Sequence, residues 1–219
     1  MSWRVERVRG GAQHFHDRVL PDPAIRSIWI HEVERPALVL GSAQSDDIVA
    51  AEAASALGVD VVRRRSGGGA VLLTPGDTLW VDLVVPAGDV LWDNDVGRAF
   101  HWLGHVWSTA LAAAGAGSSR VHTGPMMTTP LSRLVCFAGT GPGEVLIGGR
   151  KAVGMSQRRN RAGARFQCAL YAEWHADVMS AVLAAHPPVE ELAAVVHAFG
   201  ASPSLAELES AFLAAVNEC

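Results

Sequence analysis

Residues 59–71 read Val59-Asp60-Val61-Val62-Arg63-Arg64-Arg65-Ser66-Gly67-Gly68-Gly69-Ala70-Val71. The first four residues predict a short strand that delivers the chain into three successive glycines. Because glycine has no side chain, the main chain of this run can approach a ligand closely, and its amides can converge on an anion or a carboxyl oxygen. Ser66 adds a hydroxyl donor, and Arg63 and Arg64 can bind phosphate or carboxylate with forked donors. The same three glycines are also typical of a flexible turn.

Predicted strands and helices surround this glycine run in separate groups. Further strands are expected at 24–33, 37–40, 79–85, 144–147, 151–157 and 165–171. Helices are expected at 45–57 and 95–114, and after a capping box formed by Ser204 and Glu207. Because the strands are grouped and the helices lie outside them, the pattern predicts an α+β fold with a mixed or antiparallel sheet and flanking helices.

The length of the chain limits the number of domains. With 219 residues, 49% of them hydrophobic and 18% charged, the sequence predicts a single catalytic domain over 1–219 with a substantial core. Helices are expected within 175–219, which is too short a segment for a complete accessory domain.

Charge and cysteine content narrow the class of protein. A net charge of -4 argues against nucleic-acid binding. The start of the chain lacks the apolar core of a signal peptide, and no apolar run approaches the length that crosses a bilayer, so no membrane partner is expected. Cys136, Cys168 and Cys219 form neither a disulfide framework nor a zinc pattern, which is typical of a cytoplasmic protein. His101 and His105 lack the glutamate of a zinc motif, so no metal site is predicted.

Lysine occurs once in the chain, against seventeen arginines. This residue, Lys151, follows Gly148-Gly149-Arg150 and precedes Ala152-Val153-Gly154. A sequence that uses guanidinium nearly everywhere has kept an amine here, where a compact ammonium that can give up its proton is useful. Lys151 is therefore the first catalytic candidate. The alternative is an isolated charge on a solvated turn.

Four segments, taken together, resemble the lipoate-protein ligase A and octanoyltransferase family. They are Gly41-Ser42-Ala43-Gln44, the 63–71 run, Cys136-Phe137-Ala138, and the segment 149–159, which reads Gly-Arg-Lys-Ala-Val-Gly-Met-Ser-Gln-Arg-Arg. The resemblance covers roughly 28–171. This family has an α+β catalytic domain related to biotin ligases. It moves a lipoyl or octanoyl group to a lysine of an acceptor lipoyl domain, which is the partner that the resemblance implies.

The resemblance also implies roles for particular residues. Lys151 would face the activated carbonyl, where its charge would stabilise the transition state. The acyl and adenylate pocket would be lined by Arg63, Arg64, Ser66, Gly67, Gly68, Gly69 and Ala70, with Gly154 and Ser156 from the later segment. Glu144 stands where the family often has an acidic residue. It would orient an amine, bind a metal, or lie in solvent at the end of a strand.

Two positions depart from the family pattern. The His-Asp pair that commonly follows the glycine run is replaced by Leu73 and Thr74. A second commonly found pair, His-Gly, is replaced by Cys168 and Ala169. Both changes remove polar groups near the expected pocket, which leaves the usual substrate and the activity itself open.

Three functions therefore remain, and the first is the main hypothesis. A ligase would activate lipoate or octanoate with ATP and magnesium as an acyl adenylate, in some cases with an accessory subunit. A transferase would take octanoate from acyl carrier protein as a thioester on Cys136 or Cys168, and Cys136 occupies the place of the nucleophile in one branch of the family. Either cysteine would also suit a small apolar core position. A third possibility is a module that binds acyl adenylate or carrier without turnover.

Overall fold

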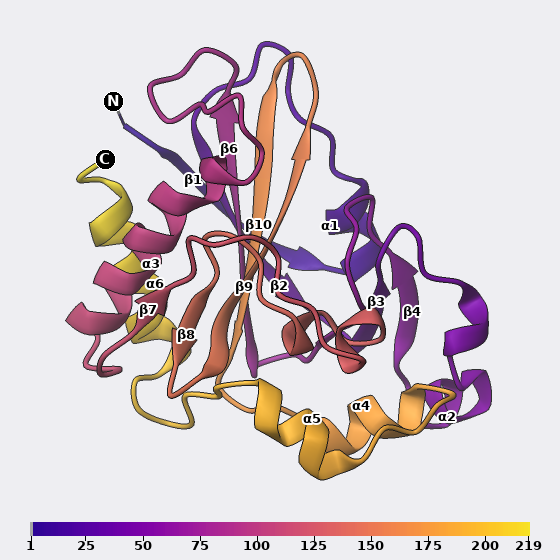
Figure 1. The fold of residues 1–219 in the computed structure, drawn as a ribbon. Helices are drawn as coiled ribbons and strands as arrows, with labels where there is room; N and C mark the ends of the chain where they lie inside the picture. Colours follow the sequence, from indigo (N-terminus) through magenta and orange to yellow (C-terminus); the bar gives the residue numbers. More distant parts are fainter. Residues whose placement is uncertain (1) are drawn as a thin grey trace.

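Seven strands form the larger of two sheets in the computed structural model, which describes residues 2–219 (Figure 1). Their order across the sheet is β1-β2-β6-β10-β9-β8-β7. Strands β1 and β2 are parallel, and the remaining neighbours are antiparallel. Their bounds are β1 Arg4–Gly10, β2 Ser27–Val33, β6 Thr78–Pro86, β7 Arg120–Val121, β8 Val145–Ile147, β9 Arg150–Arg159 and β10 Gly163–Tyr171.

Three short strands form the smaller sheet, in the order β4-β3-β5. Strand β3 (Ala37–Leu40) is parallel to β4 (Asp60–Arg63) and antiparallel to β5 (Val71–Leu73). The glycine run connects β4 to β5. Both sheets are therefore mixed, and the predicted α+β class with flanking helices is confirmed.

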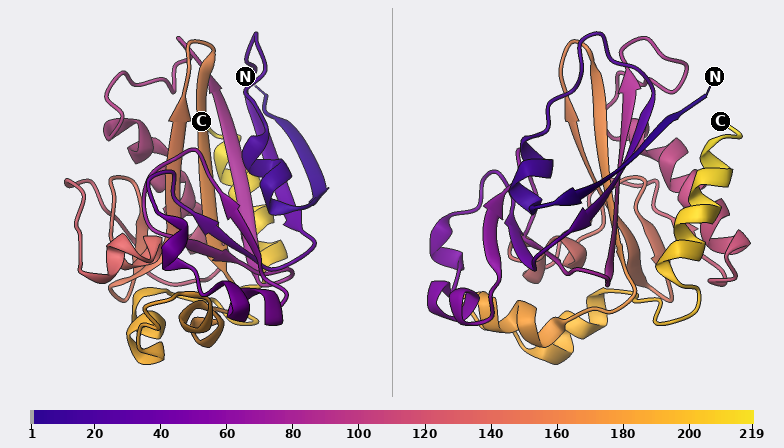
Figure 2. Two further views of the ribbon diagram at one scale, coloured as in Figure 1. Left: turned by 90° about the vertical axis from the view of Figure 1, so that its right-hand side faces the viewer. Right: turned by 180° about the vertical axis from the view of Figure 1, so that it is seen from behind.

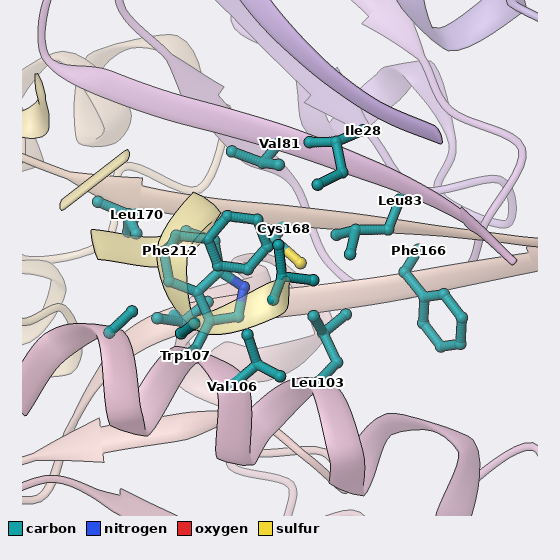
Figure 3. Close-up of a cluster of buried hydrophobic side chains, with 14 of the residues drawn as sticks. Ile28, Val81, Leu83, Leu103, Val106, Trp107, Phe166, Cys168, Leu170 and Phe212 are labelled. Atoms are coloured by element: carbon teal, nitrogen blue, oxygen red, sulfur yellow. The ribbon is translucent and has the colours of Figure 1, made fainter. Parts of the chain in front are cut away.

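Two helices cover one face of the larger sheet (Figure 1). These are α3 (His101–Ala113) and α6 (Leu205–Val216), and α6 begins with the predicted capping box. Trp107 of α3 stacks on Phe212 of α6 with ring centroids 4.0 Å apart. The two rings lie in the largest apolar cluster of the described residues, together with side chains from β2, β6 and β10 (Figure 3). Stacked and buried aromatic rings of this size supply much of the packing energy of a core.

Strand β10 shows how the two faces of the larger sheet are divided. Alternate side chains of a strand point to opposite faces. Phe166, Cys168 and Leu170 point into the apolar cluster beneath α3 and α6 (Figure 3). Gln167 and Ala169 consequently point to the other face, which looks toward the smaller sheet. That second face carries the candidate site.

The remaining helices lie around the smaller sheet and at one end of the molecule (Figure 1). They are α1 (Ala12–Asp17), α2 (Ala51–Ala56), α4 (Ala176–Val182) and α5 (Val189–Val195). Strand β1 begins close to the end of α6 (Figure 2), and the Trp3 indole donates a hydrogen bond to the Val216 carbonyl at 3.1 Å. Within residues 2–219, no helix has both the length and the apolar character needed to cross a bilayer.

The helix predicted over 45–57 is divided in two. Residues 46–48 form a 3-10 turn, and α2 begins only at Ala51. Between them, the Ala50 amide donates to the Val182 carbonyl, and the Ala184 amide donates to the Ile48 carbonyl. Pairing with this distant segment takes up the main-chain groups that a continuous helix would use. The prediction of one helix was wrong for this reason.

Candidate active site

A pocket with about 440 Å³ of empty volume lies between the two sheets. The smaller sheet contributes Val39, Val71 and Leu73 to its wall, and the larger sheet contributes Trp80 and Ala169. Most of the wall is therefore apolar. The polar groups are few and come from the side chains of His16, Arg64, Ser156 and Gln167. An apolar pocket with a small number of polar groups is typical of a small-molecule site.

Lys151 is buried beside this pocket, with 2% of the residue exposed. Its Nζ lies 2.6 Å from Oε2 of Glu144 and donates to the Cys136 carbonyl at 2.9 Å. The amine also lies 5.3 Å from the centroid of the Phe137 ring. This position excludes a solvated turn.

Glu144 holds the amine in place and is itself held by the main chain. Its Oε2 accepts from the Gly141 amide at 2.6 Å, and its Oε1 accepts from the Met155 amide at 3.0 Å. Glu144 is 4% exposed, so both charges of the pair are buried. Hydrogen bonds to the remaining lone pairs of the carboxylate offset part of the desolvation cost of such a buried pair. Of the roles open to Glu144, the structure supports orientation of an amine.

Gly154 allows Lys151 to approach the pocket. A Cβ at this position would lie 2.8 Å from Cζ of Phe137 and 3.5 Å from Cδ of Lys151. Gly154 and Phe137 line the pocket, and the lysine stem lies directly behind them. A side chain at residue 154 would push the Phe137 ring and the lysine stem away from the strand.

The glycine run and Lys151 meet at one short segment, residues 134–136. The Ala70 amide donates to the Leu134 carbonyl at 2.6 Å, and the Cys136 amide donates to the Ala70 carbonyl at 2.9 Å. A Cβ on Gly69 would lie 2.7 Å from the Cys136 nitrogen, so only glycine permits this approach. Lys151 binds the carbonyl of the same Cys136. The amine and the glycine run therefore contact the same segment, although residues 66–70 do not line the pocket and, of the residues predicted to do so, Arg64, Gly154 and Ser156 line it.

The Gly41-x-x-Gln44 element supports the glycine run from the other side. The Gln44 Oε1 accepts from the Gly41 amide at 2.9 Å, and its Nε2 donates to the carbonyls of Arg133 and Leu134 at 2.9 and 3.1 Å. A Cβ on Gly41 would lie only 1.9 Å from the Gly68 carbonyl oxygen. All four segments that carried the family resemblance thus converge on one place.

The family model for the Lipoyl protein ligase A/B catalytic domain matches residues 6–216. The chain belongs to this family. The resemblance inferred from the four segments is therefore confirmed, and the protein has a lipoate-protein ligase-like catalytic domain.

Solved structures of lipoate and biotin ligases share its fold. A T. acidophilum protein with bound lipoic acid is 18% identical with a TM-score of 0.78, and the match covers 100% of this chain and 86% of the other. A lipoate-protein ligase A bound with ATP is 16% identical with a TM-score of 0.76, covering 100% and 85%. A biotin protein ligase from Aquifex aeolicus in complex with biotin and ATP is 8% identical with a TM-score of 0.52, covering 98% and 69%. A comparison with curated proteins found no match.

Arg63 and Arg64 of this ligase-family domain bind main-chain carbonyls of neighbouring loops. Arg64 donates to the carbonyls of Gly67 and Gly69, each at 2.8 Å. Arg63 donates to the carbonyls of Gly41 and Gln44 and pairs with Asp46. Carbonyl groups in a loop lack the partners that a sheet provides and need other donors. Arg64 thereby fixes the shape of the glycine run and also lines the pocket, whereas Arg63 holds the Gly41-x-x-Gln44 element.

The amides of the glycine run remain free. Among residues 2–219, the main-chain NH groups of Gly67, Gly68 and Gly69 donate to no protein acceptor. Ser66 Oγ donates to Ser156 Oγ at 3.1 Å, so the two predicted hydroxyl residues join β9 to the loop. Successive main-chain amides without a protein acceptor are available to bind an anion.

We expect the Gly41→Ala variant to lose about 1–3 kcal/mol of unfolding free energy, because the added methyl group overlaps the Gly68 carbonyl. Urea denaturation measures this loss. Gly11→Ala is the matched control, since a Cβ on Gly11 meets no atom within 4 Å. Equal stability of the two variants would contradict the close approach of Gly41 to the glycine run.

Cys168 borders the pocket, but its side chain packs in the apolar core. It is 1% exposed, and its sulfur points into the cluster with Trp107 and Phe212 (Figure 3). Burial raises the pKa of the Cys168 thiol, which disfavours the reactive thiolate. Of the two cysteines considered as nucleophiles, only Cys136 is partly exposed and turned toward the pocket.

The positions that depart from the family pattern have different surroundings. Leu73 and Ala169 line the pocket and make its wall more apolar. Thr74 instead bonds within a turn, where its amide donates to Thr78 Oγ1 at 3.0 Å. The departures therefore change the polarity of the pocket without removing it.

Sequence reasoning missed a buried polar group beneath the pocket. Asp82 accepts from Arg165 Nε at 2.7 Å and from the Trp80 indole at 2.7 Å, and it lies 3.0 Å from His31 Nε2. Burial alone would raise the pKa of Asp82, but the charges of Arg165 and His31 and their hydrogen bonds hold it at about 2. The sequence does show an aspartate within the apolar strand Leu79–Val85. A carboxylate buried in such a strand requires charged or polar partners, which could have predicted this group.

One group of three metal-type ligands occurs among residues 2–219. It consists of Asp77, Glu173 and His175, and His175 Nε2 lies 2.8 Å from Asp77 Oδ2. These residues do not line the pocket. The helical pair His101 and His105 belongs to no such group within the described chain.

Proposed function

We propose that this domain transfers a lipoyl group, or a related medium-chain acyl group, to a lysine of a lipoyl domain through an acyl adenylate. The observation that carries the proposal is the buried ammonium of Lys151, oriented by Glu144 beside an apolar pocket. A positive charge fixed next to an acyl-sized cavity is suited to stabilise negative charge on an acyl oxygen.

The first step is activation of the free acid. A carboxylate oxygen of lipoate attacks the α-phosphorus of ATP, a new P–O bond forms, and pyrophosphate leaves. The apolar walls hold the acyl chain, and the free amides of Gly67, Gly68 and Gly69 bind the phosphate oxygens of the new mixed anhydride. The related structures that contain lipoic acid or ATP support these substrates.

The second step is transfer to the acceptor. The neutral ε-amine of the acceptor lysine attacks the acyl carbonyl carbon, an amide bond forms, AMP leaves, and the amine releases a proton to solvent. Lys151 stabilises the oxygen that becomes negative during this attack. The T. acidophilum bi-partite lipoate protein ligase, solved with its E2 lipoyl domain, supports a lipoyl domain as acceptor.

Magnesium would enter this reaction with the nucleotide. The Glu144 carboxylate is already engaged by Lys151 and two amides, so it is not a free ligand. Magnesium commonly binds through substrate phosphates and retained water. The ion would neutralise the triphosphate charge during adenylation.

We further propose that 1–219 forms one catalytic domain that works in the cytoplasm, with activation assisted by a separate subunit. The helices of 175–219 pack on the same two sheets as the rest of the chain. The bi-partite organisation of the T. acidophilum ligase supports an accessory subunit.

The intact mass of an apo lipoyl domain tests this function. One mixture contains the protein, lipoate, ATP and magnesium, and a second contains the protein and octanoyl acyl carrier protein. We expect a lipoyl mass increase in the first mixture. An increase only in the second would support the transferase, and no increase in either, despite binding of an acyl adenylate analogue, would support a binding module.

Transfer through Cys136 is the second candidate function, because this thiol lines the pocket and is partly exposed. Its thiolate would attack the thioester carbonyl of octanoyl acyl carrier protein, and the carrier thiol would leave. The acceptor amine would then displace the cysteine.

The Cys136→Ser variant separates the two routes. We expect it to retain turnover with lipoate and ATP to within about tenfold, since it alters only one wall of the pocket. A complete loss of transfer, together with an octanoyl adduct on Cys136 in the unmodified protein, would contradict the adenylate route. Mass spectrometry of the protein and the acceptor provides both measurements.

A further inference from the structure

His16 lies on α1 at the edge of the pocket and is 8% exposed. Its ring packs 4.6 Å from the ring of Trp80, which also lines the pocket. Burial lowers the pKa of His16 to about 3, with further lowering by Arg165 and Arg64 and an opposing effect from Asp82. The imidazole is therefore neutral at ordinary working pH.

One ring nitrogen of His16 is occupied and the other is free. The Gln167 side-chain nitrogen lies 3.4 Å from His16 Nδ1. An amide nitrogen only donates, so Nδ1 accepts and Nε2 carries the hydrogen. Among residues 2–219, Nε2 has no hydrogen-bond partner although it is buried. Buried donors are nearly always paired, so Nε2 is available to an acceptor atom of a ligand or of an ordered water.

The other polar lining side chains are partly engaged. Arg64 binds the carbonyls of Gly67 and Gly69 through Nε and one NH₂ group, and Ser156 Oγ accepts from Ser66 Oγ. Within the described chain, His16 Nε2 is the one side-chain atom of the pocket wall that is both buried and unpaired.

The pocket wall runs from Gly154, which lies in front of Lys151, to Trp80, on which His16 packs. Gly154, in front of Lys151, pairs with Ala169, and Ala169 pairs with Trp80 on the next strand. Neighbouring strands are about 4.8 Å apart, so the pocket extends roughly 10 Å from Gly154 to Trp80. An acyl group with its carbonyl near Lys151 would bring its distal carbons to Trp80 and His16.

We propose that His16 is a specificity-determining residue whose Nε2 donates a hydrogen bond to a sulfur or oxygen atom on the distal carbons of the acyl chain. The pocket accordingly prefers a chain with a distal heteroatom, such as a dithiolane or a hydroxyl group, over a plain alkyl chain of equal length. This inference rests on the proposed function and defines the substrate class of that site. Because sulfur is a weak acceptor, the preference is modest, about tenfold for a dithiolane.

Binding of three free acids tests the inference by isothermal titration calorimetry. The probes are lipoate, octanoate and 8-hydroxyoctanoate, and the proteins are the unmodified chain, His16→Phe and His14→Phe. Phenylalanine at residue 16 keeps an aromatic ring on Trp80 but removes the donor. His14 is exposed on the same helix, so His14→Phe is the matched control.

We expect the unmodified protein and His14→Phe to bind lipoate and 8-hydroxyoctanoate about tenfold more tightly than octanoate. In His16→Phe, the affinity for octanoate is retained and the preference disappears. His16→Gln, which restores an NH donor, is expected to recover part of it.

Three results would overturn the inference. These are equal binding of the acids by the unmodified protein, a preference that survives in His16→Phe, and an equal loss of affinity for all three acids in that variant. The last result indicates a purely structural role. Failure of the unmodified protein to bind any of the acids would instead overturn the proposed function, and this inference with it.

Discussion

Replacing Lys151 with methionine is expected to lower kcat for acyl transfer by about 10² to 10³. The substitution keeps the length of the side chain and removes the one ammonium that lies beside the pocket. Because the charge acts on an oxygen that becomes negative only during the reaction, we expect kcat to fall more than the affinity for lipoate changes. Steady-state kinetics with an apo lipoyl domain measures both quantities.

Loss of stability is a competing explanation, because Lys151→Met leaves Glu144 buried without its partner. The double variant with Glu144→Gln removes both charges and is expected to regain much of the unfolding free energy. Its activity is expected to remain as low as that of Lys151→Met. Recovery of turnover in the stable double variant would show that the amine only maintains the fold.

Asp82→Asn is expected to cost about 3–5 kcal/mol of unfolding free energy, because it leaves the Arg165 charge buried without a counter-ion. For a chain of this length the melting temperature would fall by roughly 10 °C. Asp60→Asn is the control, since it breaks only an exposed pair with Arg35 and should cost less than about 1 kcal/mol. A similar effect of the two substitutions would contradict the role of the buried group.

The same variant has a characteristic dependence on pH. The pKa of Asp82 is about 2 in the folded protein, below its ordinary value of 3.8. As the pH falls, the carboxylate of Asp82 is therefore protonated in the unfolded chain before it is protonated in the folded protein. The stabilisation from Asp82 is fully present above about pH 4 and is lost as the pH falls toward 2. We expect the unfolding free energy of Asp82→Asn to lack this part of the acid dependence. Identical slopes in both proteins between pH 4 and pH 2 would contradict the depressed pKa.

Local patterns pointed to the segments that lie around the pocket, because these segments are short motifs. The glycine run, the Gly41-x-x-Gln44 element and the single lysine were all visible in the sequence, and they meet in the structure. The capping box of α6 was predicted for the same reason, since its two partners are three residues apart.

The other features depend on contacts between distant segments. His16 joins the pocket because α1 packs on Trp80, which is far away in the sequence. The predicted helix over 45–57 is interrupted because residues near 49 pair with residues near 183. Arg63 and Arg64 looked like ligand-binding side chains, but the nearby loop carbonyls bind them. A single sequence carries no local signal for these pairings.

The peptide units of Cys136 couple two parts of the protein mechanically. The amide of this residue donates to Ala70, and its carbonyl accepts from Lys151. Movement of the glycine run is therefore transmitted to the ammonium, and a ligand that orders one of them also orders the other. Damage at either end should therefore also disturb the other, which separate substitutions in the glycine run and at Lys151 would reveal as non-additive effects on activity.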